Sequence, residues 1–62
     1  METFEIAPVE TLTDATEPLI IECVDGMAFG PYAALLADVI RYYPNATECY
    51  VYADGTVDAF SH

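Results

Sequence analysis

The sequence predicts an α+β fold, a small antiparallel sheet of three to four strands with one helix packed on one face. Two stretches with strand character, residues 19–24 and 48–60, enclose residues 31–43, whose apolar residues follow the helical period. Because 62 residues suffice for one small domain only, we expect residues 1–62 to share a single core. The expected order is β-β-α-β-β, or β-α-β-β with an N-terminal extension.

The N-terminal part of the chain differs in character from the rest. Residues 1–17 form an acidic segment in which apolar and acidic residues alternate, and residues 18–62 hold the expected β-α-β-β core. We expect an edge strand near residues 2–7 that ends at Pro8, because proline cannot donate to a strand ladder. Residues 11–18 are rich in turn-forming residues and indicate a loop.

The first core strand is predicted from a short apolar run. Residues 19–24 are rich in β-branched residues, and they end at Asp25-Gly26, a typical turn pair. The apolar residues of this run fall on both faces, which favours a central strand. Cys23 lies in this run and Cys49 lies in a later one, so both are expected to be buried free thiols.

The helix is predicted from its start signal, its periodicity and its stop signal. Gly30-Pro31 suits a helix start, since proline is tolerated in the first turn. Pro44-Asn45 would end the helix. Between them, six large apolar residues form one broad stripe at the helical period. They are Tyr32, Leu35, Leu36, Val39, Ile40 and Tyr43.

Residues 48–60 alternate in polarity around Asp54-Gly55 and predict a β-hairpin. The small aliphatic residues share the face that should meet the helix, and the acidic and aromatic residues share the other. To keep the two faces separate, we expect Ala53 to pair with Val57 and Val51 with Ala59, across a loop of residues 54–56. The acidic and aromatic face would then carry Glu48, Tyr50, Tyr52, Asp54, Asp58 and Phe60.

Charge is the strongest functional signal in this chain. Eleven carboxylates face one certain cation, Arg41, which gives a formal net charge of −10. A net charge of this size is informative about binding partners and solubility, and it does not indicate the fold. It disfavours direct binding to nucleic acid phosphates and to anionic membranes. No apolar segment reaches the ~18 residues of a membrane helix, and the N-terminus lacks the features of a signal peptide. We therefore expect a cytoplasmic protein.

No catalytic constellation is visible in the sequence. The only imidazole is His62, at the very C-terminus, where side chains are seldom held rigidly. Eleven carboxylates will produce chance pairs, so a metal site from Glu48, Asp54 and Asp58 is outweighed by a solvated acidic face. We expect a protein that is not an enzyme and that has no cofactor and no metal site.

Residues 26–61 resemble the first part of the phosphocarrier HPr. In that family, glycine and an aliphatic residue precede the catalytic histidine, and alanine, arginine and proline follow it. Gly26 and Pro31 match this pattern, whereas Ala28 stands at the histidine position and Gly30 at the arginine position. The resemblance implies a shared topology without phosphocarrier activity, as in an HPr-like regulatory binding module.

In size and charge the chain also resembles the small acidic inhibitors of bacteriophages, the anti-CRISPR and anti-restriction proteins. This likeness is one of class, and no motif carries it. It implies a DNA mimic that occupies the basic DNA or PAM site of a CRISPR surveillance complex or a restriction enzyme in a bacterial host. Same-face residues of a strand lie ~6.7 Å apart, so adjacent acidic strands can present phosphate-like spacing. The expected partner-binding residues are Glu22, Glu48, Asp54, Asp58, Tyr50, Tyr52, Glu5 and Glu10.

Two alternatives to the mimic stay open. A halophilic, small acidic homodimeric protein would spread its acids evenly and bury its aromatic face in the dimer. An HPr-like module would recognise a basic partner unrelated to DNA. A mimic instead needs its carboxylates gathered on one surface. Since seven of the eleven acids lie in residues 1–25, the outcome depends on whether that segment packs beside the hairpin.

Overall fold

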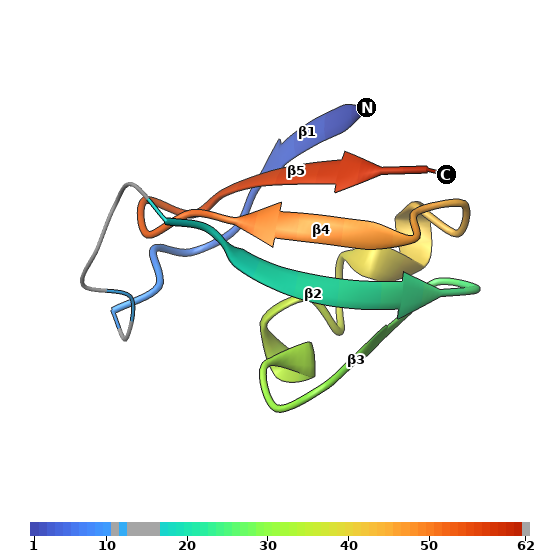
Figure 1. Cartoon of the computed structure of the whole chain (residues 1–62), viewed down its shortest axis with the longest axis horizontal. Coiled ribbons are helices and arrows are strands. Elements are labelled where there is room, and N and C mark those ends of the chain that lie inside the picture. The colour runs from blue at the N-terminus through green and yellow to red at the C-terminus, as the bar shows by residue number, and fades with distance from the viewer. Residues whose placement is uncertain (11, 13–16, 62) are drawn as a thin grey trace.

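The computed structural model describes residues 1–10, 12 and 17–61, which form one antiparallel sheet of five strands. The strand order across the sheet is β1-β5-β4-β2-β3 (Figure 1). The strands are β1 (Glu2–Glu5), β2 (Leu19–Val24), β3 (Met27–Phe29), β4 (Glu48–Val51) and β5 (Thr56–Phe60). Residues 30–43 return across one face of this sheet, which leaves the opposite face open.

The predicted helix over residues 31–43 is wrong, and so is the α+β fold class. The segment contains two short 3-10 helices, η1 (Ala33–Leu35) and η2 (Ile40–Tyr42), so the described chain is a β-sheet protein without a packed α-helix. Most of its backbone hydrogen bonds reach back three residues, as from Tyr43 N–H to the Ile40 carbonyl at 2.9 Å. Residues 18–62 accordingly contain β2, β3, η1, η2, β4 and β5 in place of the expected β-α-β-β core.

Helix propensity and length explain why the α-helix loses to tighter turns. A helix of about thirteen residues is marginal in isolation, and β-branched and aromatic residues lose side-chain freedom in a helix. Packing therefore decides the backbone. Leu36 and Ile40 are buried against the sheet, whereas Tyr32 is 45% exposed. Of the six residues in the predicted stripe, all within the described chain, only Leu36 and Ile40 are fully buried. They are four residues apart, and the Ile40 amide donates to the Leu36 carbonyl at 2.8 Å.

The core lies between the inner face of the sheet and residues 30–43. Alternate residues of β2, β4 and β5 point into it, as the burial pattern of each strand shows. Phe4 of β1 stacks on Tyr43 at 4.5 Å between ring centroids and closes one side. The buried members are Val9, Ile21, Cys23, Leu36, Ile40, Ala46, Cys49, Val51, Val57 and Ala59.

The β4–β5 hairpin has the predicted faces in a different register. Val51 pairs with Val57, whereas the sequence-based register paired Val51 with Ala59. Gly55 N–H donates to the Tyr52 carbonyl at 3.0 Å, and Gly55 has a φ of 93°, which places the turn one residue earlier than expected. A shift of two residues keeps every side chain on its face, so alternation alone cannot detect it.

The two edge strands of the sheet are β1 and β3. β1 is an edge strand near the expected residues 2–7, and it pairs with β5 so that Phe4 opposes Val57. β3, which the sequence did not predict, forms the other edge and pairs with β2. Asp25 and Gly26 have φ values of 52° and 76°, which suits the tight two-residue turn of this hairpin.

Candidate protein-binding face

The open side of the sheet is the candidate functional surface, and we call it the outer face. Its residues alternate with the buried core residues along each strand, and strand pairing aligns them in rows. Four of them are carboxylates contributed by four different strands. The outer-face residues are Thr3, Glu5, Ile20, Glu22, Val24, Met27, Phe29, Glu48, Tyr50, Thr56, Asp58 and Phe60.

Two carboxylates oppose each other in the middle of this face. Glu22 of β2 and Glu48 of β4 are direct cross-strand partners. Side chains in such a pair have Cβ atoms roughly 5 Å apart, and like charges at this distance destabilise a sheet. On either side of the pair, Phe60 is the partner of Glu48 and Phe29 is the partner of Glu22. The row therefore presents two acids flanked by two aromatic rings.

The neighbouring row adds a third carboxylate and a second aromatic pair. Asp58 is the cross-strand partner of Tyr50, and its Oδ1 accepts a hydrogen bond of 3.0 Å from the Thr3 hydroxyl. The Tyr50 ring meets Phe60 edge-on, with 5.0 Å between centroids and an interplanar angle of 61°. These contacts orient Asp58 and Tyr50 on the sheet, so this part of the outer face is ordered before any partner arrives.

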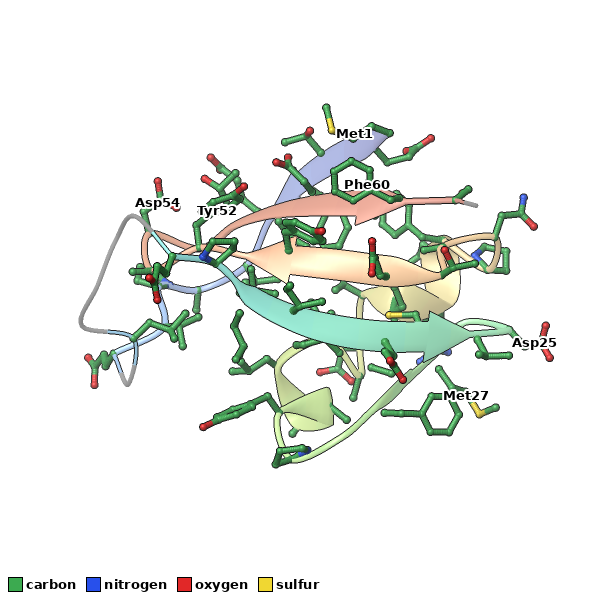
Figure 2. The ribbon with its side chains drawn as sticks, in the orientation of Figure 1. Met1, Asp25, Met27, Tyr52, Asp54 and Phe60 are labelled. Carbon is green, nitrogen blue, oxygen red and sulfur yellow. The ribbon has the colours of Figure 1, made fainter. Side chains whose placement is uncertain are left out.

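The remaining predicted residues lie at the edge of the outer face or at the turn end. Glu5 is on β1, paired with Thr56, and continues the outer face. Figure 2 shows Asp54 and Tyr52 together at the β4–β5 turn. Glu10 lies at the same end, because the preceding residue, Val9, donates its amide to the Ala53 carbonyl at 3.0 Å.

Asp54 differs from the other acids because it is held by its own turn. The Thr56 amide donates to Asp54 Oδ1 at 2.9 Å. This backbone hydrogen bond, followed by one from the Thr56 hydroxyl, lowers the pKa of the Asp54 carboxyl. Asp54 is therefore charged at neutral pH and serves as a turn-forming residue as well as a candidate contact.

The structure thus brings Glu5, Glu22, Glu48, Tyr50 and Asp58 onto one face and leaves Tyr52, Asp54 and Glu10 at its end. Other acids point elsewhere, since exposed Glu2 is on the inner-face side of β1 and exposed Asp38 lies between η1 and η2. Arg41 is in η2, and its guanidinium carbon lies 5.9 Å from the centre of the Tyr42 ring. The single cation is therefore on the opposite side of the sheet from the outer face.

Sequence reasoning missed the apolar residues of the outer face. β2 is an interior strand as expected, but Ile20 and Val24 are each 55% exposed, and of residues 19–24 only Glu22 was expected to face a partner. Met27 and Phe29 of β3 are 56% and 50% exposed. The available signal was Glu22, because a carboxylate in the middle of a strand indicates that its face, shared with Ile20 and Val24, meets water.

Both cysteines lie inside the core. Cys23 and Cys49 are buried free thiols whose Sγ atoms are 3.7 Å apart. Burial, followed by the Cys23 thiol, raises the pKa of Cys49 to about 12, and burial also raises the pKa of Cys23. Such thiols are poor nucleophiles. Within residues 1–10, 12 and 17–61, no three His, Cys, Asp or Glu side chains are arranged to hold a metal ion.

Fold and face together define a small antiparallel-sheet protein with an open surface of carboxylates and aromatic rings. Comparison with known proteins gives no match: no family model, curated protein or solved structure is significantly similar to the chain. In the described part of the chain, no helix has the length and apolar character that a membrane crossing requires. The functional argument therefore depends on the outer face itself.

Proposed function

We propose that this chain is an acidic DNA-mimic inhibitor whose outer face binds the basic DNA or PAM site of a CRISPR surveillance complex or another DNA-binding defence enzyme. By occupying that site in the cytoplasm of a bacterial host, it would block binding of target DNA. The observation that carries the proposal is the direct opposition of Glu22 and Glu48 in the middle of an open sheet face.

A cationic surface is electrostatically complementary to two carboxylates that face each other across a strand pair. In the free protein the two carboxylates repel each other, and the strands hold them in register. A groove of lysine and arginine residues would remove this repulsion. It would also release the counterions that each surface holds, as it does when it binds DNA. Asp58 and Glu5, on neighbouring strands of the same face, would extend the array beyond the central pair.

The aromatic residues of the outer face would add packing contacts to the electrostatic attraction between the two surfaces. Protein interfaces are enriched in aromatic residues at their centres, where well-packed rings contribute much of the binding energy. Tyr50 and Phe60 are already packed edge to face beside Asp58 and Glu48. An inhibitor with this surface would keep part of its affinity at salt concentrations that displace DNA.

One observation favours the halophilic alternative as a second candidate. Exposed Glu2, Glu10, Asp25 and Asp38 lie away from the outer face, so part of the charge is spread over the molecule. A protein that is acidic for solubility in high salt would tolerate loss of charge from any face equally. No observation favours the HPr-like module. The helix that the resemblance includes is absent, and Ala28 and Gly30 stand where that family has its active-site residues.

The test compares two triple variants that remove the same charge from different surfaces. The face variant is Glu22→Gln, Glu48→Gln and Asp58→Asn, where asparagine can still accept the hydrogen bond from Thr3. The control variant is Glu2→Gln, Glu10→Gln and Asp38→Asn, all at exposed positions. Purified surveillance complexes and restriction enzymes are assayed for target-DNA binding in the presence of each protein, across a salt series.

We expect the native chain and the control variant to displace DNA from one of these enzymes, and the face variant to be at least about tenfold weaker. Equal loss of inhibition in both variants would show that total charge, and not the outer face, determines binding. If the native chain displaces DNA from none of the enzymes, the mimic proposal fails. Low-salt unfolding that molar salt reverses would then support the halophilic candidate.

A further inference from the structure

The edge strand β3 and the 3-10 helix η1 carry no charged side chain. Residues 26–37 contain no charged side chain, although the chain as a whole is 19% charged. This stretch includes β3 and η1, which contact each other. The nearest acids in sequence, Asp25 and Asp38, lie just outside its two ends. β3 and η1 therefore carry no charge of their own, although Glu22 of β2 lies opposite Phe29 and Asp25 begins the turn before β3.

The region around β3 displays most of the exposed large hydrophobic residues of the described chain. Five side chains between 45% and 56% exposed come from the β2–β3 hairpin and the residues that follow it. We call this group the apolar end, and it consists of Ile20, Val24, Met27, Phe29 and Tyr32. Figure 2 shows Met27 at the β3 margin of the sheet, on the opposite side from Met1 and Phe60. A hollow of about 270 Å³ separates Ile20 and Phe29 from Tyr32.

The two edges of the sheet differ in their protection against strand pairing. Charged residues on an edge strand discourage another strand from adding to it. β1 carries Glu2 and Glu5, whereas β3 is Met27-Ala28-Phe29 and carries no charge. Of the two edge strands, β3 is therefore the one without a charged side chain that would discourage pairing.

The backbone of β3 is oriented for pairing at its central residue. Cys23 N–H donates to the Thr47 carbonyl at 3.0 Å, so the Cys23 amide points toward β4 and away from β3. Cys23 is the partner of Ala28, and partners in an antiparallel pair either exchange both hydrogen bonds or neither. The amide and carbonyl of Ala28 therefore point outward, beyond the edge of the sheet.

We propose that a second copy of this chain pairs with the β3 edge, strand to strand and antiparallel, about a two-fold axis near Ala28. In this arrangement Met27 of each copy lies opposite Phe29 of the other, and Ala28 faces Ala28. The two five-stranded sheets become continuous, and the hydrophobic residues of the apolar end are brought together on both sides of the axis. The proposal does not depend on the proposed inhibitory function, because pairing at the β3 edge leaves the carboxylates Glu22, Glu48 and Asp58 uncovered.

Charge favours a second copy over a basic partner as the occupant of this edge. A basic protein would be attracted to the carboxylates of the outer face, and it gains nothing at an edge without charge. Two copies, each with a formal charge of −10, repel least where they meet through a strand without acids, and β3 is such a strand although Glu22 lies beside it on β2. If Met27 and Phe29 of each copy cover the exposed halves of the other's, each copy buries roughly 200 Å², so the dimer depends mainly on the backbone hydrogen bonds of the β3 edge.

The dimer should consequently be weak and should be strengthened by salt. Repulsion between the copies falls as the Debye length shrinks from about 10 Å at 0.1 M to about 3 Å at 1 M salt. The contact at β3 is between uncharged residues, so salt does not weaken it. A contact between acidic and basic groups would show the opposite dependence on salt.

The experiment is sedimentation equilibrium of the full chain over a hundredfold range of protein concentration, at low and at molar sodium chloride. Two variants disrupt the edge in different ways. Phe29→Glu places a charge on the apolar end. Ala28→Pro removes the outward amide without adding a charge, and an edge strand is the place where a sheet tolerates proline. The matched control is Tyr42→Glu, because Tyr42 is 72% exposed and lines a separate hollow with Glu2 and Ser61. Circular dichroism establishes that each variant is folded.

We expect a monomer–dimer equilibrium that tightens in molar salt, a dissociation constant at least about tenfold higher for both edge variants, and no change for Tyr42→Glu. A native chain that stays monomeric at molar salt over the whole concentration range would overturn the proposal. So would a dimer that both Phe29→Glu and Ala28→Pro leave unchanged, because its interface would then lie elsewhere.

Discussion

Replacement of Glu22 by glutamine should stabilise the free protein, although Glu22 is a central residue of the proposed binding face. Glu22 is exposed and lies directly opposite Glu48 on the neighbouring strand. Glutamine has nearly the same shape and removes one of the two facing charges. The repulsion that is relieved, and not a change of packing, should determine the effect.

The size of the effect follows from the distance and from the solvent. Two carboxylates about 6 Å apart in water repel each other by about 0.7 kcal/mol. Weak screening at about 0.01 M salt leaves about 0.6 kcal/mol, whereas a Debye length of about 3 Å at 1 M salt leaves about 0.1 kcal/mol. The low-salt value agrees with the range of about 0.2–1 kcal/mol found for cross-strand pairs.

Urea unfolding at low and at molar salt measures this effect. With an m value of roughly 1 kcal/mol/M for so small a domain, the midpoint should rise by roughly 0.6 M at low salt. Glu10→Gln is the control, because it removes the same charge from an exposed position outside the described sheet. A gain in Glu22→Gln that is no larger than in Glu10→Gln, or that persists in molar salt, would refute the repulsion argument.

Two further predictions concern the turn and the core. Gly55→Ala should lower stability by about 2 kcal/mol or more, because φ is 93° and the added Cβ would collide with the Ile6 carbonyl oxygen; thermal unfolding should show a smaller loss for Gly30→Ala, where nothing lies within 4 Å. For Cys49, burial and the Cys23 thiol raise the pKa from 9.0 to about 12, so stability present below pH 9.0 should decline as the pH rises toward 12. The unfolded chain releases this proton first, and Cys49→Ala should show a shallower alkaline decline in urea unfolding.

Four of the five strands, all except β3, could be predicted from the sequence because strand-forming residues in alternation or in a short run precede a turn or a proline. The β4–β5 hairpin has a period-2 pattern, whereas residues 19–24 are a β-branched run that ends at the turn pair Asp25-Gly26. The helix prediction failed because a period of 3.6 also fits a series of tighter turns in which only Leu36 and Ile40 are fully buried. β3 was missed because three residues are too few to show a period.

The candidate face could be predicted only in part, because strand order is not encoded locally. Alternation places Glu48, Tyr50 and Asp58 on one side of a hairpin. It does not say which strand lies beside the hairpin. β2 pairs with β4 and brings Glu22 opposite Glu48, while β1 pairs with β5 and brings Glu5 beside Thr56. These long-range pairings follow from burial of the shared inner face, which includes Ile21 and Val57.

Stability and binding place opposite demands on Glu22, and this opposition can separate the two interpretations of the acidic surface. If the outer face binds a cationic groove, Glu22→Gln should gain stability and lose inhibition, because the charge that repels Glu48 is also the charge that the partner neutralises. A purely solubilising acid would show the gain without the loss. Since the two measurements use the same variant, folding defects cannot imitate the result: a more stable protein that binds less well has lost a contact, not its structure.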